Sequence, residues 1–269
     1  MLKENIVILL SACINPSGMP FTMLQDCNIR KNQYIKAINW YLVHTTFPIV
    51  FVENSGIYIG DSFNEYIESN RIEFITFNGN NYDKSLGKGY GEALIIEEAI
   101  EKSKLLSNCD NIVKITGRLI IKNIKKLTKG IRTRKNRIMA FSGKKNNFVC
   151  SSFFFVAPRI FFENYFLKSF YKINDSKNIY FEHILYEEIV KWILDGNYYH
   201  EFYHYIDTIG VSGSTGEKYP RTSLYKECKN LIKGFYINIV RHEKYIYQMD
   251  NVDWISVYRN SCKQSKNGY

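Results

Sequence analysis

The sequence contains no CxxC motif, no internal repeat and no long hydrophobic run. Its six cysteines, at positions 13, 27, 109, 150, 228 and 262, are irregularly spaced, which argues against a zinc module or a disulfide framework. The apolar run at residues 6–10 is too short for a signal peptide or a membrane span. We therefore expect a protein of the reducing cytoplasm.

Acidic residues are scarcer than basic ones, so the chain of 269 residues carries a formal net charge of +10. Residues 121–137 contain eight Lys and Arg residues and no acid. This stretch is either a solvated surface or a patch that contacts anionic lipid head groups on the inner face of the cytoplasmic membrane. No zinc finger or aromatic RNA-binding motif accompanies the charge, so nucleic acid is not an expected partner.

Apolar residues make up 45% of the chain, which is enough for a sizeable core. In the first half, apolar runs typical of buried strands alternate with helical patterns. Strands are predicted at residues 6–13, 47–56 (with a turn), 71–77 and 112–115, and helices at 30–44, 62–70 and 92–106. This alternation predicts an α/β fold with a parallel sheet.

The second half has a different order of elements. Two strands are predicted close together, at residues 137–143 and 148–157, followed by a helix from Pro158 to about residue 170. A helix at 180–196 that ends at Gly196, a strand at 198–211 and a long final helix at 223–249 complete the chain. We expect a catalytic domain at residues 1–220 and a helical C-terminal extension at 221–269.

Ligands of open α/β sheets bind at the carboxyl ends of the strands. The predicted strand ends place Asn15, Glu53 and Asn54 on one edge of the sheet, together with segments 87–92 and 116–118. This edge is therefore the expected binding site.

The segment LGKGYGEAL, residues 86–94, contains Gly87, Gly89 and Gly91 around Lys88 directly before a predicted helix. Glycines allow a ligand to approach the backbone, and a helix N-terminus attracts anions. The spacing matches neither a Walker loop nor the dinucleotide fingerprint. The alternative interpretation is a plain flexible turn.

The segment KITGR ends the fourth predicted strand. Thr116 offers a hydroxyl, Gly117 removes steric bulk, and the planar guanidinium of Arg118 suits phosphate oxygens. Lys114 points to the same side as Thr116 if the strand is regular. The alternative is a strand end with a surface arginine.

Three further patterns are weaker. HEFYH, residues 200–204, matches the zinc-protease pattern, but its aromatic flanks favour a strand, in which His200 and His204 would be about 13 Å apart, too far for one metal. Glu182 begins a predicted helix, either as an ordinary helix start or as a general base. Residues 210–220 form either a mobile lid or an exposed loop.

Residues 87–118, with CSSFFFVAP (150–158) and YFEHILYE (180–187), resemble bacterial glycosyltransferases of surface polysaccharide synthesis. The resemblance covers residues 5–215. It implies the GT-A, Rossmann-like architecture: a mixed sheet flanked by helices that binds a nucleotide sugar, with a helical C-terminal part.

In that family an Asp-x-Asp element holds a divalent cation against the donor diphosphate. No Asp-x-Asp occurs in this chain, and the corresponding place is occupied by Thr116-Gly117-Arg118. The resemblance therefore implies that Arg118, with Lys88 and Lys114, binds the diphosphate, because a guanidinium can neutralise part of the leaving-group charge. Dependence on Mn²⁺ or Mg²⁺ stays open.

The resemblance also implies that the loop from Ser11 to Asn15 and the carboxylate of Glu53 face the nucleoside. The expected donor site comprises Ser11, Asn15, Glu53, Asn54, Gly87, Lys88, Gly89, Gly91, Glu92, Lys114, Thr116 and Gly117. Glu182 is the expected base, and an inverting transfer is expected from a UDP-linked donor to a saccharide or a lipid-diphosphate acceptor.

Two alternatives on the same fold remain. A non-catalytic nucleotide- or phosphosugar-binding protein would use the glycines and Arg118 but not Glu182. A nucleotidyltransferase would normally have a cation-containing loop after the first strand, and SACINPSGMP has no cation. The sequence predicts no oligomeric state.

Overall fold

The structure is a computed structural model that describes residues 5–129, 131, 136–140, 150–213, 215–220 and 223–235, and the backbone of residues 244–249 and 253–258. Part of the basic stretch 121–137 and the predicted strand residues 141–149 lie outside these ranges.

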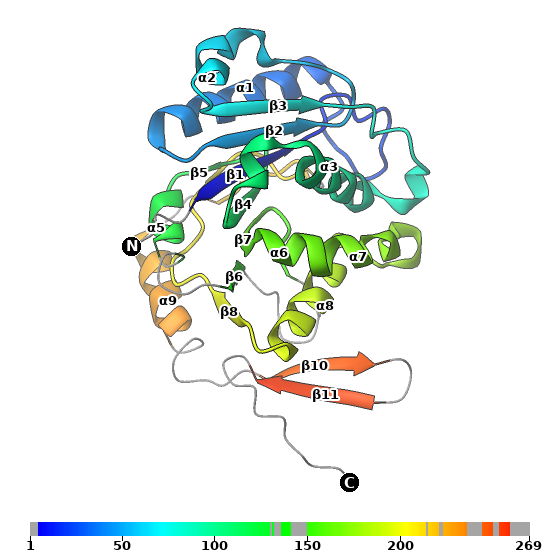
Figure 1. Ribbon diagram of the computed structural model, residues 1–269, viewed down its shortest axis with the longest axis vertical. Coiled ribbons are helices and arrows are strands. Elements are labelled where there is room, and N and C mark those ends of the chain that lie inside the picture. Colours follow the sequence, from blue (N-terminus) through cyan, green and yellow to red (C-terminus); the bar gives the residue numbers. More distant parts are fainter. Residues whose placement is uncertain are drawn as a thin grey trace.

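A seven-stranded sheet in the order β3-β2-β1-β4-β7-β6-β8 forms the centre of the molecule (Figure 1). Its strands are β1 (Ile6–Ala12), β2 (Ile49–Glu53), β3 (Ile72–Thr76), β4 (Asn111–Thr116), β6 (Arg137–Ala140), β7 (Phe154–Pro158) and β8 (Tyr198–Glu201). Strands β1 to β4 are parallel, whereas β7 runs antiparallel to both β4 and β6. The sheet is therefore mixed.

Helices cover both faces of the sheet. They are α1 (Cys27–His44), α2 (Asn64–Glu68), α3 (Lys88–Lys102), α4 (Lys104–Ser107), α5 (Ile124–Thr128), α6 (Arg159–Phe161), α7 (Leu167–Ser169), α8 (Phe181–Leu194) and α9 (Leu224–Phe235). A π-helical turn, Phe162–Phe166, joins α6 to α7. The expected α/β, Rossmann-like fold with a mixed sheet and flanking helices is confirmed.

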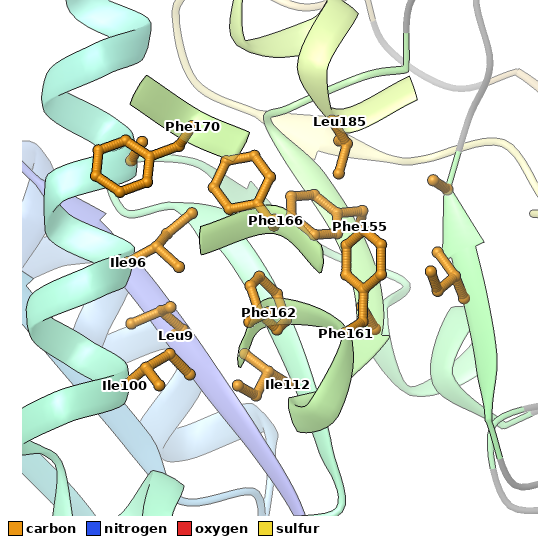
Figure 2. Close-up of a cluster of buried hydrophobic side chains, with 14 of the residues drawn as sticks. Leu9, Ile96, Ile100, Ile112, Phe155, Phe161, Phe162, Phe166, Phe170 and Leu185 are labelled. Atoms are coloured by element: carbon orange, nitrogen blue, oxygen red, sulfur yellow. The ribbon is translucent and has the colours of Figure 1, made fainter. Parts of the chain in front are cut away.

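Two hydrophobic clusters, one on each face, explain why the strands read as continuous apolar runs. Val7 and Leu9 of β1 pack on one face with α3, α8 and the segment around Phe162, whereas Ile8 and Leu10 pack on the other face with α1. Figure 2 shows the first cluster, in which aromatic rings from α6 to α7 fill the space between α3 and β7. Strands buried on both faces need no polar alternation.

The Gly-rich segment differs from its prediction. The helix was expected to begin at residue 92, but α3 begins at Lys88, so Gly89 and Gly91 lie in its first turn. Gly87 is the N-cap, with a φ of 86° that favours glycine. A side chain at Gly87 would overlap the carboxyl group of Asp175.

The predicted C-terminal helix at 223–249 is wrong at residues 244–249, and residues 236–243 lie outside the described ranges. The described helix is α9, whereas β10 (Lys244–Met249) and β11 (Asp253–Tyr258) pair antiparallel. Among the described residues of 221–269, the expected helical character therefore applies to α9 and not to β10 or β11. The domain boundary at residue 220 stays a prediction.

The predicted strand at 198–211 is interrupted. It forms β8 and then β9 (Thr208–Ile209), which pairs with β5 (Ile120–Ile121) outside the main sheet. This small sheet brings the chain after residue 209 back beside the end of β4. Among the described helices, none combines the length and the apolar composition required to cross a bilayer.

Candidate functional site

A cavity of about 370 Å³ opens at the carboxyl ends of β1 and β4. The chain runs from β1 to β2 and β3 on one side and returns to β4 on the other, so the topology switches direction between β1 and β4. Such switch points leave a crevice in open α/β sheets. The cavity is therefore at the edge predicted to bind the ligand.

The ends of β1 and β4 form the base of the cavity. Ser11 pairs with Thr116 in the sheet register, and both line the cavity. Gly117 follows directly, and a Cβ there would lie 2.8 Å from the carbonyl oxygen of Ser11. The glycine at this position is thus required for packing between two chain segments, whereas it does not itself line the cavity.

Lys114 occupies a different environment from the one predicted. Its ammonium group is fully buried and lies 2.5 Å from Glu92 Oε1 and 2.6 Å from the carbonyl oxygen of Ser152. Glu92 Oε1 also accepts a hydrogen bond of 2.8 Å from the Ser11 hydroxyl. Lys114 therefore neutralises Glu92 below the cavity, and the expected contact with a diphosphate is not supported by its position.

Arg118 lies where the sequence predicted a cation. Its side chain is buried and lines the cavity, and its Nη1 donates to the Val211 carbonyl oxygen at 3.1 Å. Its four other N–H groups have no acceptor among the described residues, and no described carboxylate forms an ion pair with it. Burial lowers the pKa of this guanidinium, and nearby Arg30 acts in the same direction.

Arg30 is a second buried guanidinium in the cavity wall, and sequence reasoning missed it. It donates through Nε to the Cys13 carbonyl oxygen at 2.8 Å and through Nη1 to that of Leu24 at 3.2 Å. Tyr34, one turn later on α1, donates its hydroxyl to the Cys13 carbonyl oxygen and has a pKa raised by burial. Arg30 likewise has no carboxylate partner among the described residues.

Glu53, the last residue of β2, and Asn54, which follows it, have different environments. Glu53 is fully buried and accepts from the backbone N–H groups of Ile14, Ser55 and Ile57, so its carboxylate holds the loops and does not line the cavity. The predicted contact of Glu53 with a nucleoside is not supported by this position. Asn54 does line the cavity, and its buried Oδ1 has no hydrogen-bond partner among the described residues.

Asn15 also lies outside the cavity lining. It is exposed, its backbone N–H donates to the Ser55 hydroxyl at 2.9 Å, and its carbonyl oxygen accepts from the Asn80 side chain at 2.9 Å. Asn80 in turn lines the cavity. The loop after β1 thus lines the cavity through residues such as Cys13, whereas Asn15 acts on the site through Asn80, which lies in the loop after β3.

The first turn of α3 forms another wall of the cavity, with Lys88, Gly89, Gly91 and Glu92 in the lining. A Cβ at Gly89 would lie 3.0 Å from Phe181 Cβ, so this glycine lets α3 approach the start of α8. The glycines therefore serve helix packing as well as access to the helix N-terminus. The structure brings this segment and Arg118 together in one cavity.

Two carboxylates face the cavity from the region around α8. Glu182, in the first turn of α8, accepts a hydrogen bond of 2.5 Å from the Ser152 hydroxyl. Asp175 was not predicted; burial and the charge of Glu182 raise its pKa, and Lys88 opposes the shift. The cavity therefore has arginines on one wall and a pair of carboxylates on another.

Residues 211–213 close one side of the cavity. Val211, Ser212 and Gly213 line it, and a Cβ at Gly213 would lie 2.5 Å from Arg118 Nη2. The guanidinium therefore packs directly against this backbone, and a side chain at Gly213 would require it to shift. The segment predicted as a lid or an exposed loop thus contacts Arg118.

The HEFYH segment forms no metal site of the zinc-protease kind. His200 and Glu201 lie in β8, as their flanks predicted, and His204 Nδ1 lies 2.8 Å from Glu227 Oε1. No group of three or more His, Cys, Asp or Glu side chains in the described ranges is placed to hold a metal ion.

The strand order and the cavity at the switch point define an α/β, Rossmann-like protein with a cavity at the strand ends. No family model and no curated protein matches the sequence.

Among solved structures, the chain is similar to core-mannan synthase A from Aspergillus fumigatus in its Mn/GDP form, at 7% identity and a TM-score of 0.43 over 90% of this chain and 87% of that one. It is also similar to a cytidylyltransferase from Leptospira borgpetersenii, at 12% identity and a TM-score of 0.40 over 91% and 100%. A mannosyltransferase from S. cerevisiae in complex with GDP gives 10% identity and a TM-score of 0.40 over 86% and 82%. At these identities and TM-scores, the similarity assigns no activity to this chain.

Proposed function

We propose that the protein is a glycosyltransferase that uses a nucleotide-diphosphate sugar as donor. One observation carries the proposal: Arg118 and Arg30 are buried in one cavity wall, without a carboxylate partner among the described residues. A buried unpaired charge is costly, so two such cations favour an anionic ligand. A diphosphate offers oxygen atoms that match the donors of guanidinium groups.

The rest of the cavity suits the other parts of such a donor. Ser11, Asn54 and Thr116 offer hydroxyl and amide groups in the same cavity as the arginines, and the buried Asn54 Oδ1 has no donor within the described part of the chain. The first turn of α3 provides backbone N–H groups and Lys88. We propose that these groups bind the nucleotide of the donor, and that its nucleobase is uracil.

Glu182 is the proposed general base. It takes the proton of the acceptor hydroxyl as that oxygen bonds to the anomeric carbon and the bond from this carbon to the diphosphate oxygen breaks. Arg118 and Arg30 neutralise charge on the departing nucleoside diphosphate. Direct attack by the acceptor gives inversion at the anomeric carbon.

We also propose the biological setting implied by the sequence resemblance. The acceptor is a saccharide or a lipid-diphosphate-linked sugar in bacterial surface polysaccharide synthesis, and the enzyme works in the cytoplasm at the inner membrane surface. The basic residues exposed on and around α5, Lys122, Lys125, Lys126 and Lys129, support this placement.

A product assay tests the proposed reaction. The protein is incubated with UDP- and GDP-sugars and a mixture of saccharide and lipid-diphosphate acceptors, and nucleoside diphosphate is measured. We expect release by the wild type, a loss of at least about 100-fold in Glu182→Gln, and wild-type release by Glu163→Gln, a surface control, because a general base contributes about that factor or more.

Other products identify the two alternatives. Pyrophosphate formed from a nucleoside triphosphate and a sugar phosphate would make the protein a nucleotidyltransferase. Nucleotide binding without turnover of any donor would make it a binding protein. Either result would overturn the proposed reaction while leaving the anion site intact.

A further inference from the structure

Helix α9 exposes apolar side chains along one face. Leu224, Cys228, Leu231, Ile232 and Phe235 follow the i, i+4, i+7, i+8, i+11 spacing that places side chains on one side of a helix. The exposed fractions are 87% for Leu224, 72% for Ile232 and 55% for Phe235. Side chains of this kind are normally buried, so a helix with such a face is expected to meet an apolar environment.

The side of α9 next to this face is fixed to the body of the protein. Glu227 accepts from Lys126 Nζ at 2.7 Å and from the Tyr205 backbone N–H at 3.2 Å. Gly234 is buried, and a Cβ there would lie 2.8 Å from Tyr203 Cα. The apolar face is therefore held outward by specific contacts.

Exposed lysines flank this face on both sides. Lys229 and Lys233 lie beside it on α9. Lys125 and Lys129 lie on and just after α5, which is tied to α9 through Lys126 and Glu227 and lies next to it in Figure 1. An apolar stripe between cations is the pattern of a helix that lies in the plane of an anionic bilayer surface.

We infer that α9, with the lysines of α5, is a docking surface for an anionic lipid bilayer. The apolar side chains enter the boundary between head groups and acyl chains, and the lysines contact the negative head groups. A second copy of the chain fits this surface less well, because two copies would bring their lysines together. Helix α9 would thus be the element that holds the protein at the proposed membrane location, and this docking rests on no step of the transfer reaction.

Vesicle sedimentation tests the docking surface in the absence of any donor. Full-length protein is mixed with vesicles of phosphatidylcholine alone or of phosphatidylcholine with phosphatidylglycerol, at low and high salt. We expect binding only to the anionic vesicles, and weaker binding at high salt because salt screens the lysines.

Two variants separate the apolar and the charged parts. Each variant is expected to lower the partition coefficient by at least about ten-fold. The variant Ile232→Asn/Phe235→Asn removes apolar area that enters the bilayer. The variant Lys229→Glu/Lys233→Glu removes two near-surface cations, each of which contributes roughly five-fold. Matched changes elsewhere, Tyr171→Asn (66% exposed) and Lys36→Glu/Lys168→Glu, should leave it unchanged. All these positions are exposed, and thermal unfolding checks that each variant is folded.

Three results would overturn the inference. They are absence of wild-type binding to anionic vesicles, equal binding by the α9 variants, and self-association that the α9 variants abolish while vesicle binding persists. None of them bears on nucleoside diphosphate release, so a failed docking surface and a failed reaction are told apart.

Discussion

At the scale of single residues, the cavity floor depends on the ion pair between Lys114 and Glu92. The Lys114 side chain is 0% exposed and that of Glu92 is 21% exposed. Removing one partner of such a pair leaves a buried charge without compensation. The pair also orients Glu92, whose Oε1 accepts from Ser11 and Lys114.

Replacing Lys114 by Met should therefore destabilise the protein strongly. We expect Lys114→Met to lower the free energy of unfolding by about 3 kcal/mol or more. Urea unfolding followed by circular dichroism measures the change. The double variant Lys114→Met/Glu92→Gln should recover part of the loss, and a single variant as stable as the wild type would contradict the role of the pair.

Arg118 and Glu182 were predictable because each follows a recognisable boundary. Arg118 comes two residues after the end of a buried strand, and Glu182 lies in the first turn of a periodic helix. Arg30 and Asp175 gave no such signal. Their place in the cavity depends on contacts between distant segments, such as that of Asp175 with Gly87, which a sequence pattern does not contain.

At the scale of elements, α9 is attached through the carboxylate of Glu227. Hydrogen bonds from Lys126, Tyr205 and His204 outweigh the effect of burial and lower its pKa below the ordinary value of 4.5. A carboxyl group with a lowered folded-state pKa stabilises the fold above its unfolded-state pKa. That contribution is lost as the pH falls through the folded-state pKa.

Protection of the α9 amides should follow this titration. We expect hydrogen-exchange protection factors in α9 to be constant near neutral pH and to decrease as the pH falls below about 4.5. Glu227→Gln should lower them about ten-fold at pH 7, the effect of a lost charge-assisted hydrogen bond, and should flatten the pH dependence. Unchanged protection in this variant, with Glu163→Gln as the control, would mean that other contacts hold α9.

The elements that sequence predicted best are those whose pattern has one physical cause. The apolar runs of β1, β2 and β4 are buried on both faces of the sheet, and β8 was expected from its aromatic alternation. The start of α3 was missed because glycines near a helix normally indicate a loop, whereas Gly89 here is needed for contact with Phe181. The final helix was wrongly extended over β10 because residues 236–249 contain no strong breaker.

At the scale of the whole molecule, positive charge serves two separate surfaces. Arg30 and Arg118 are buried at the strand ends, while the lysines of α5 and α9 are exposed beside an apolar face. Salt should therefore affect vesicle binding strongly and nucleotide binding less, because screening is weaker for buried charges. This separation allows the donor site and the docking surface to be tested independently.

The central claim is that Arg118 binds the diphosphate of a nucleotide. The most direct measurement is calorimetric titration of UDP, GDP and CMP, with and without Mn²⁺, into the wild type, Arg118→Ala and the control Arg159→Ala. We predict that UDP binds without Mn²⁺ and that Arg118→Ala, unlike the control, weakens binding by at least about ten-fold, the roughly 1.5–3 kcal/mol of a charge-assisted contact. Binding that requires Mn²⁺ and ignores Arg118, or no binding at millimolar concentration, would contradict the claim.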